Sequence, residues 1–126
     1  MRPIKPRFFA TITRRDPAAG TSSQFTTEVV GRVAWCLLAL LQAGRKGCTP
    51  ITRPAPRWSD YVFRLRGQGI NVATNEEPHE GSYSGHHARY VLLDEVTVDG
   101  GNLDTFLAAP EGREFSDFAF ARRAAA

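Results

Sequence analysis

The fold is decided by residues 32–69, RVAWCLLALLQAGRKGCTPITRPAPRWSDYVFRLRGQG. Residues 32–44 are rich in good helix formers and end in a glycine, which is typical of a helix C-cap. Apolar side chains surround this segment on nearly every side, so a helix here must be largely buried. In residues 57–66 the apolar residues recur at helical spacing, which predicts a second, amphipathic helix. These apolar positions are Trp58, Tyr61, Val62 and Leu65.

Residues 45–57, which join the two predicted helices, contain three prolines. Thr49 followed by Pro50 is a favourable N-cap with proline at the first helical position. Pro54 and Pro56 would interrupt any longer helix. The connection is therefore predicted to hold a short helical turn.

Two predicted strands precede the helices. Residues 8–13 and 21–30 are rich in aromatic and β-branched residues, and residues 16–20 between them form a turn signal with an early proline and a late glycine. We therefore expect an N-terminal β-hairpin.

After the second helix the pattern changes again. Residues 70–74 and 88–93 are predicted to be strands, separated by a polar, glycine-containing loop over residues 75–87. Residues 95–98 are expected to extend this sheet after a kink at Asp94. The pair of strands with its long loop has the form of a β-hairpin that follows directly on a helix.

A chain of 126 residues is the length of one ordinary domain. We predict a flexible basic arm over residues 1–7, the folded domain over residues 8–98, and an acidic, weakly ordered extension over residues 99–126. The longest apolar run, residues 33–41, is far too short to cross a bilayer, and no export signal is recognisable. We therefore expect a cytoplasmic protein in which Cys36 and Cys48 are reduced thiols.

Charge is distributed unevenly along the chain. Residues 1–66 hold twelve Lys and Arg against three Asp and Glu, whereas residues 67–126 hold four against ten. This division favours one face that meets a polyanion and another that meets something else.

The order helix, short turn, helix, strand, loop, strand predicts an α+β fold, a winged helix-turn-helix with an N-terminal β-hairpin and a C-terminal β wing. In such a fold the second helix enters the major groove of DNA. We predict that base readout comes from Arg53, Arg57, Ser59 and Arg64, with Gln68 suited to adenine. Phosphate contacts are expected from the N-terminal arm and from Arg45, Lys46 and Arg89.

A family resemblance points the same way. The stretch from about Phe8 to Val98 resembles winged helix domain proteins of alphaproteobacterial genomes and their prophages. It rests on GRVAWCLLALLQAGRKGCTPI (31–51), PAPRWSDYVFRLRGQGINV (54–72) and GHHARYVLL (85–93). The resemblance implies a DNA-binding role, as a transcriptional regulator or a mobile-element factor that is associated with the nucleoid when bound.

The acidic residues of the expected wing conflict with simple DNA contact. Glu76, Glu77 and Glu80 would repel phosphates. Either the wing points away from DNA, or its polar residues make the contacts, namely His79, Ser82, Tyr83, Ser84, His86 and His87. An alternative function is a protein-interaction or dimerisation module that works through the acidic wing and the Phe-bearing tail and does not bind DNA.

Enzymatic and metal-dependent functions find little support in the sequence. No nucleophile elbow, phosphate-binding loop or dinucleotide fingerprint is present. The three histidines lack the helical spacing of zinc sites, and the two cysteines lack CxxC spacing. We therefore expect neither an enzyme nor a metal or cofactor.

Overall fold

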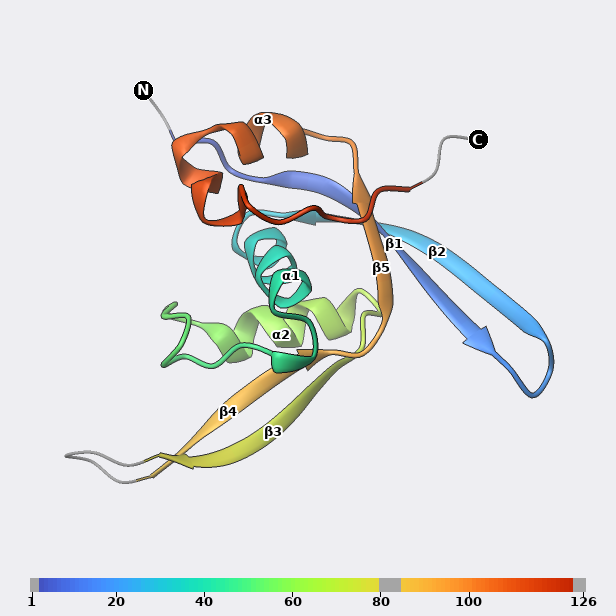
Figure 1. Cartoon of the computed structure of the whole chain (residues 1–126), viewed down its shortest axis with the longest axis horizontal. Coiled ribbons are helices and arrows are strands. Elements are labelled where there is room, and N and C mark those ends of the chain that lie inside the picture. The colour runs from blue at the N-terminus through green and yellow to red at the C-terminus, as the bar shows by residue number, and fades with distance from the viewer. Residues whose placement is uncertain (1–2, 80–84, 124–126) are drawn as a thin grey trace.

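The computed structural model describes residues 3–79 and 85–123 of the chain, which combine helices with two small antiparallel sheets (Figure 1). In chain order the elements are β1 (Arg7–Asp16), β2 (Thr21–Val30), α1 (Arg32–Ala43), the 3-10 turn η1 (Gly44–Lys46), α2 (Trp58–Gly67), β3 (Val72–His79), β4 (Gly85–Leu92), β5 (Glu95–Asp99), α3 (Leu103–Ala108) and the 3-10 helix η2 (Pro110–Phe115). The predicted α+β content and the predicted order of hairpin, two helices and second hairpin are confirmed.

The first sheet has the strand order β2-β1-β5. β1 and β2 form the predicted hairpin, in which Phe8 faces Val29 and Ile12 faces Phe25. β5 runs along the other edge of β1, so the expectation that residues 95–98 extend the second sheet is wrong. The cause is Asp94, whose carboxylate accepts hydrogen bonds from Arg14 and from the Asn71 amide and so turns the chain toward β1.

α1 forms the centre of the core, as its apolar sequence predicts. Every residue from Ala34 to Leu40 is buried, and Gly44 caps the helix with a bond to the Leu40 carbonyl. Figure 1 shows α1 standing between the C-terminal segment and α2. The Trp58 ring on α2 lies 5.6 Å from Trp35 of α1 and stacks at 5.7 Å on Tyr90 of β4. This aromatic row joins both helices to the second hairpin.

The connection between the helices forms turns and no α-helix, in agreement with the predicted interruption by proline. The Thr49 carbonyl accepts the Arg53 amide at 2.9 Å, and the Thr49 and Thr52 hydroxyls are 3.0 Å apart. Cys48 pairs with Tyr90 as an isolated bridge beside β4. Gly47 has a φ of 71°, and a Cβ there would lie 2.5 Å from the Tyr90 carbonyl oxygen, so this approach requires glycine.

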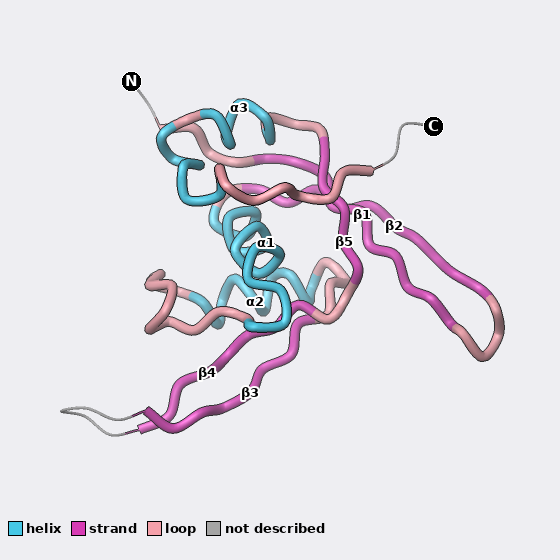
Figure 2. Tube along the Cα trace, viewed as in Figure 1, coloured by secondary structure: helices cyan, strands magenta, loops and turns pink. Residues whose placement is uncertain are grey.

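The second sheet is the hairpin β3–β4, paired from Val72 opposite Leu92 to His79 opposite Gly85. The strands are longer than predicted, and the expectation of a loop over residues 75–79 and 85–87 is wrong. Glu77 lies opposite His87, contacts its Nε2 at 3.2 Å and makes an ion pair with Arg89, so polar residues stabilise this pairing. Figure 2 shows the two hairpins projecting from the helical centre in different directions.

The C-terminal segment is packed where a weakly ordered extension was expected. Leu103, Phe106, Phe115 and Phe120 are buried, and the last three lie in a row of aromatic contacts. Three phenylalanines of the tail therefore belong to the core: Phe106 lies on α3, Phe115 on η2 and Phe120 on the segment that follows, whereas Phe118 is exposed.

Residues 3–6 are also anchored, contrary to the expected flexible arm. The Lys5 carbonyl accepts a bond from Asn102 Nδ2, and the Ile4 amide donates to Glu111 Oε2 at 3.2 Å. Pro6 is buried, and its carbonyl accepts the Gly31 amide. The C-terminal segment thus holds the N-terminal one in place.

Cys36 and Cys48 are buried free thiols. Burial raises the pKa of both, which keeps them protonated near neutral pH. In the described part of the chain, no helix has the length and apolar character needed to span a bilayer.

Candidate nucleic-acid interface

α2 has one buried face and one outward face. Trp58, Tyr61, Val62 and Leu65 are buried, as their spacing predicts. A residue advances about 100° around a helix, so Ser59 and Phe63 stand on the opposite side. Phe63 is 73 % exposed, and no described segment covers it. We call the exposed line of Ser59, Phe63 and Gly67 the α2 ridge.

One flank of the α2 ridge meets the β3–β4 hairpin. Arg66 donates through Nη2 to the Val72 carbonyl and to Thr74 Oγ1, both at 2.7 Å, which ties β3 to the helix. Strand alternation and register place Glu76 and His86 on the same hairpin face as Thr74. His86 is exposed there.

The other flank of the ridge borders a groove of about 360 Å³. Its floor and walls come from the end of β2, the start of α1 and the first two turns of α2. Four basic side chains and one acidic side chain line it, namely Lys5, Arg32, Arg57, Arg64 and Asp60. We call it the basic groove.

The cations of the basic groove differ in their pairing. Arg64 is 63 % exposed and contacts Asp60 through Nε at 3.1 Å. Arg32 lies over the Trp35 ring at 5.3 Å. Within residues 3–79 and 85–123, Lys5, Arg32 and Arg57 make no ion pair with a carboxylate, and all three are exposed.

Arg53, which the sequence predicted to read bases, is held by hydrogen bonds to other side chains of the protein. Its Nη2 donates to Glu114 Oε1 and its Nη1 to Gln42 Oε1, each at 2.7 Å. The guanidinium also lies 5.0 Å from the centre of the Phe115 ring. The structure therefore does not bring Arg53 to the α2 ridge, because the tail acid supplies a partner that the sequence alone did not reveal.

Gln68, also predicted to read a base, faces the first hairpin. Its Nε2 donates to Thr27 Oγ1 at 2.9 Å and to the Glu28 carbonyl at 2.5 Å. This side chain fastens the end of α2 to β2, so it is not available on the ridge in this structure.

The predicted contacts on the second hairpin are divided between its faces. Arg89 donates through Nε to Glu77 Oε2 at 2.5 Å and through Nη1 to the Lys46 carbonyl at 2.8 Å. Hydrogen bonding from Arg89 lowers the pKa of Glu77 most, and His87 adds to this effect. Arg89 and His87 therefore lie together on the hairpin face opposite His86. Tyr83 lies outside the described residues, as do Glu80, Ser82 and Ser84.

Arg45 and Lys46 are exposed on η1, at the C-terminal end of α1. Arg32 stands at the other end of this twelve-residue helix. A helix of that length spans about 18 Å, so this pair does not join the basic groove. The predicted basic residues thus fall into separate places and not onto a single face.

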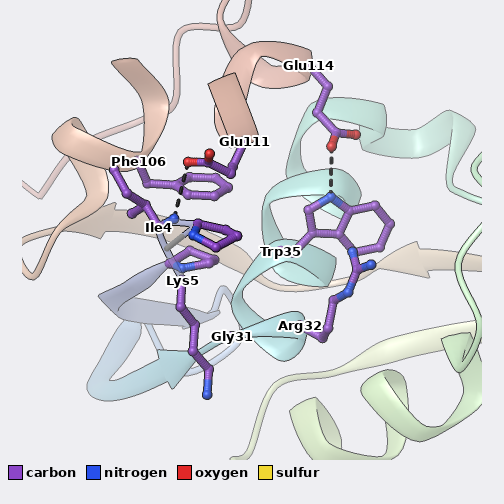
Figure 3. A pocket seen from close by; sticks show the side chains of 10 residues that line it. Ile4, Lys5, Gly31, Arg32, Trp35, Phe106, Glu111 and Glu114 are labelled. Carbon is purple, nitrogen blue, oxygen red and sulfur yellow. Dashed lines mark hydrogen bonds between the residues drawn. The ribbon is translucent and has the colours of Figure 1, made fainter. Parts of the chain in front are cut away.

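A second pocket, also about 360 Å³, lies between α1, the N-terminal residues and the C-terminal segment (Figure 3). Its carboxylates are already engaged. Glu114 Oε2 accepts the Trp35 indole N–H at 3.0 Å, and Glu111 accepts the Ile4 amide. Figure 3 shows Lys5 extending past Gly31, away from both carboxylates.

No group of three or more His, Cys, Asp and Glu side chains among the described residues is arranged to hold a metal ion. Buried side-chain nitrogen and oxygen atoms in that part of the chain all have hydrogen-bond partners.

Sequence reasoning missed Phe63 and Arg32 on this surface, and it included Lys5 only as part of the N-terminal arm expected to contact phosphates. Phe63 could have been found, because it is an apolar residue four positions after Ser59 on the polar side of a predicted helix. Arg32 carries no local signal, and the approach of both Lys5 and Arg32 to Arg57 depends on the tertiary fold.

Comparison with protein families gives a match to the winged helix domain over residues 26–102. The match begins inside β2, covers both helices and the β3–β4 hairpin, and ends at the residue before α3. No curated protein and no solved structure matches the chain. Because the matched residues form more than half of the chain and include the helix pair with its following hairpin, this protein belongs to the winged helix domain family.

Proposed function

We propose that this domain binds double-stranded DNA by inserting the α2 ridge into the major groove. The observation that carries the proposal is the exposure of that ridge between the β3–β4 hairpin on one flank and four basic residues on the other. A helix about 10–12 Å across fits a major groove about 12 Å wide. Winged helix domains are often DNA-binding modules, which agrees with this role.

Base readout in this proposal comes from Arg57, Ser59, Phe63 and Arg64. Arginine can hold guanine through two hydrogen bonds, serine can donate or accept, and phenylalanine can pack on the thymine methyl group. Arg53 and Gln68 are not included, because each is held by the protein itself. Arg45 and Lys46 remain candidates for phosphate contacts outside the ridge.

Of the wing carboxylates, Glu77 contributes less repulsion than the sequence suggested, whereas Glu76 is exposed on the face that carries Thr74 and His86. Glu77 is paired with Arg89 and contacts His87 on the face that points away from α2. His86 stands on the nearer face and is a candidate for contact with the DNA backbone. In the cell, such a domain would act as a transcriptional regulator or mobile-element DNA-binding factor in the cytoplasm, on the nucleoid.

The test measures binding to a random-sequence duplex by fluorescence anisotropy at about 50 and 200 mM salt. We expect affinity to fall with salt with a log–log slope of about −0.9 for each phosphate neutralised. The variant Arg57→Glu/Arg64→Glu should abolish binding. The control Arg113→Glu/Arg123→Glu makes the same charge change at exposed positions of the C-terminal segment and should retain binding.

Absence of binding by the wild-type protein at low salt would exclude this function. Equal loss of binding in both double variants would mean that net charge, and not the α2 surface, governs the interaction. Circular dichroism of each variant verifies that the fold is intact.

The alternative, a protein-interaction module, receives less support from the described residues. Phe106, Phe115 and Phe120 of the tail are buried and offer no apolar surface to a partner. Glu77 of the wing is already paired. If wild-type protein fails to bind duplex and sediments as a dimer, this second function is the better description.

A further inference from the structure

We propose that the basic groove is the binding site of one backbone phosphate of the bound duplex. Lys5 and Arg32 contact this phosphate whatever the DNA sequence. This inference rests on the proposed function. It adds Lys5 from the N-terminal segment and Arg32 from the start of α1, and assigns them to the sugar–phosphate backbone and not to the bases.

The first support is the convergence of charge. The groove gathers Lys5, Arg32, Arg57 and Arg64 from three separate parts of the chain, against Asp60 alone. Asp60 is already engaged by Arg64 at 3.1 Å. Lys5, Arg32 and Arg57 therefore keep their positive charge unmatched by any described carboxylate, which is the pattern of a surface that meets a polyanion.

The second support is how the groove is built. Lys5 is held at its backbone, because its carbonyl accepts Asn102 Nδ2 at 2.8 Å. Its side chain crosses Gly31, where a Cβ would lie 2.7 Å from Lys5 Cε. Gly31 also has a φ of 66°, so glycine both turns the chain from β2 into α1 and leaves space for the lysine. The cation is thus carried on a fixed segment.

The third support is position relative to α2. Arg66, which is tied to β3, and Arg64, which lines the groove, point to opposite flanks of the helix. The two phosphate backbones of a duplex run along the two edges of its major groove. A helix seated there has one backbone beside each flank, so the basic groove lies where one of them must pass. Phosphate contacts of this kind fix orientation and carry no sequence information.

The side chains that line the basic groove are chemically suited to bind a phosphodiester. Ammonium and guanidinium groups donate charge-assisted hydrogen bonds to phosphate oxygens, and arginine does so in a fork geometry. The groove also lies beside the first turns of α1 and α2, whose partial charge has the same positive sign. Inorganic phosphate shares this chemistry, so it serves as a probe that is independent of DNA.

The first experiment compares Lys5→Gln/Arg32→Gln with the matched control Arg113→Gln/Arg123→Gln, both of which remove two positive charges from exposed sites. Duplex affinity is measured across salt concentrations. For the groove variant we expect a log–log slope shallower by about 0.9, equal weakening for random and selected sequences, and an unchanged base preference in a binding-site selection. The control should keep the wild-type slope.

The second experiment titrates inorganic phosphate into wild-type protein and follows backbone amide resonances. We expect saturable shifts at Gly31, Arg32 and Arg57 that are absent in the Lys5→Gln/Arg32→Gln variant. These residues border the groove, whereas amides of the β1–β2 turn should not move.

The outcomes separate the two proposals. Suppose that the groove variant binds duplex with an unchanged salt dependence and that inorganic phosphate shifts no amide resonance of the wild type. This result overturns the phosphate site while DNA binding stands. If inorganic phosphate shifts the amide resonances but the protein does not bind duplex, DNA binding is overturned while the phosphate site stands. A changed base preference in the groove variant would also overturn the inference, because it assigns these residues to the backbone alone.

Discussion

The guanidinium of Arg53 donates to Glu114 Oε1 at 2.7 Å, joining the turn before α2 to a helix that lies 61 residues further along the chain. Glu114 Oε2 also accepts the Trp35 indole N–H, so one carboxylate links α1, the inter-helix turn and η2. Arg53 is only 21 % exposed in this arrangement. An arginine that sequence alone suggested for base readout is instead a structural cross-link.

Arg53→Ala should therefore affect stability more than DNA binding. Charge-assisted hydrogen bonds of partly exposed groups contribute about 1–2 kcal/mol, and we expect a loss of that size in the free energy of unfolding. Arg57→Ala, at an exposed position without a described carboxylate partner, should show the reverse pattern. Urea denaturation and duplex anisotropy on both variants make the comparison. A strong loss of duplex affinity in a well-folded Arg53→Ala variant would show that Arg53 contacts DNA after all.

Phe115→Ala should strongly destabilise the fold. The ring is fully buried and packs near Phe106 and Phe120 with centroid distances of 6.3 and 6.1 Å. Removal of a buried phenylalanine side chain costs about 3–5 kcal/mol. Phe118, which is 37 % exposed, provides the control, and its alanine variant should lose much less. Thermal and urea unfolding measure the loss of stability in both alanine variants. Similar small losses would show that the C-terminal segment is dispensable for the fold.

Asp94 should make stability fall at acid pH. Burial raises its pKa most strongly, but hydrogen bonds from Arg14 and the Asn71 amide together outweigh burial and lower the pKa below its ordinary value. The unfolded chain therefore binds this proton more tightly than the folded one. The stabilisation is complete above the ordinary pKa of about 3.9 and is lost as the pH falls through the lower, folded value.

Asp94→Asn should lower the free energy of unfolding at pH 7 by about 1–2 kcal/mol and make its decline below about pH 4 less steep. Urea midpoints at several pH values measure this dependence. Asp117→Asn, at an exposed position with no ion pair in the described region, is the control. A parallel pH profile for Asp94→Asn and wild type would contradict the role of Asp94.

Asp60→Asn should strengthen duplex binding at low salt. Asp60 is the acidic residue of the basic groove, so its removal lessens repulsion of phosphate, and the gain should shrink as salt screens the charge. The lost i,i+4 pair with Arg64 should cost only about 0.3–0.5 kcal/mol of stability. Asp104→Asn makes the same charge change on α3 beside Arg122. Equal tightening in both variants would attribute the effect to net charge.

Much of the helical core could be predicted from local patterns. The apolar run with its terminal glycine predicted α1, and the spacing of Trp58, Tyr61, Val62 and Leu65 predicted the buried face of α2. These patterns are readable because a helix places residues three and four apart on one face. The N-terminal hairpin followed from its turn residues for the same local reason.

The strand limits and the tail were less predictable. Glu77 reads as a loop residue by itself, and becomes a strand residue through pairing with His87 and Arg89 across the hairpin. The phenylalanines after Leu103 have no strong period, and the burial of Phe106, Phe115 and Phe120 depends on tertiary packing, including contacts among their own rings. Neither effect is contained in a window of neighbouring residues.

The sequence by itself determined that α1 and α2 form, which faces they bury and that positive charge concentrates in the first half of the chain. Only the tertiary structure decided which arginines are free to meet a ligand. Arg53 is neutralised by Glu114, whereas Arg57 is joined by Lys5 and Arg32 in an exposed groove. The physical reason is that a helix arises from interactions within a few residues, whereas a charge takes its partner through space, from whatever segment the fold brings near it.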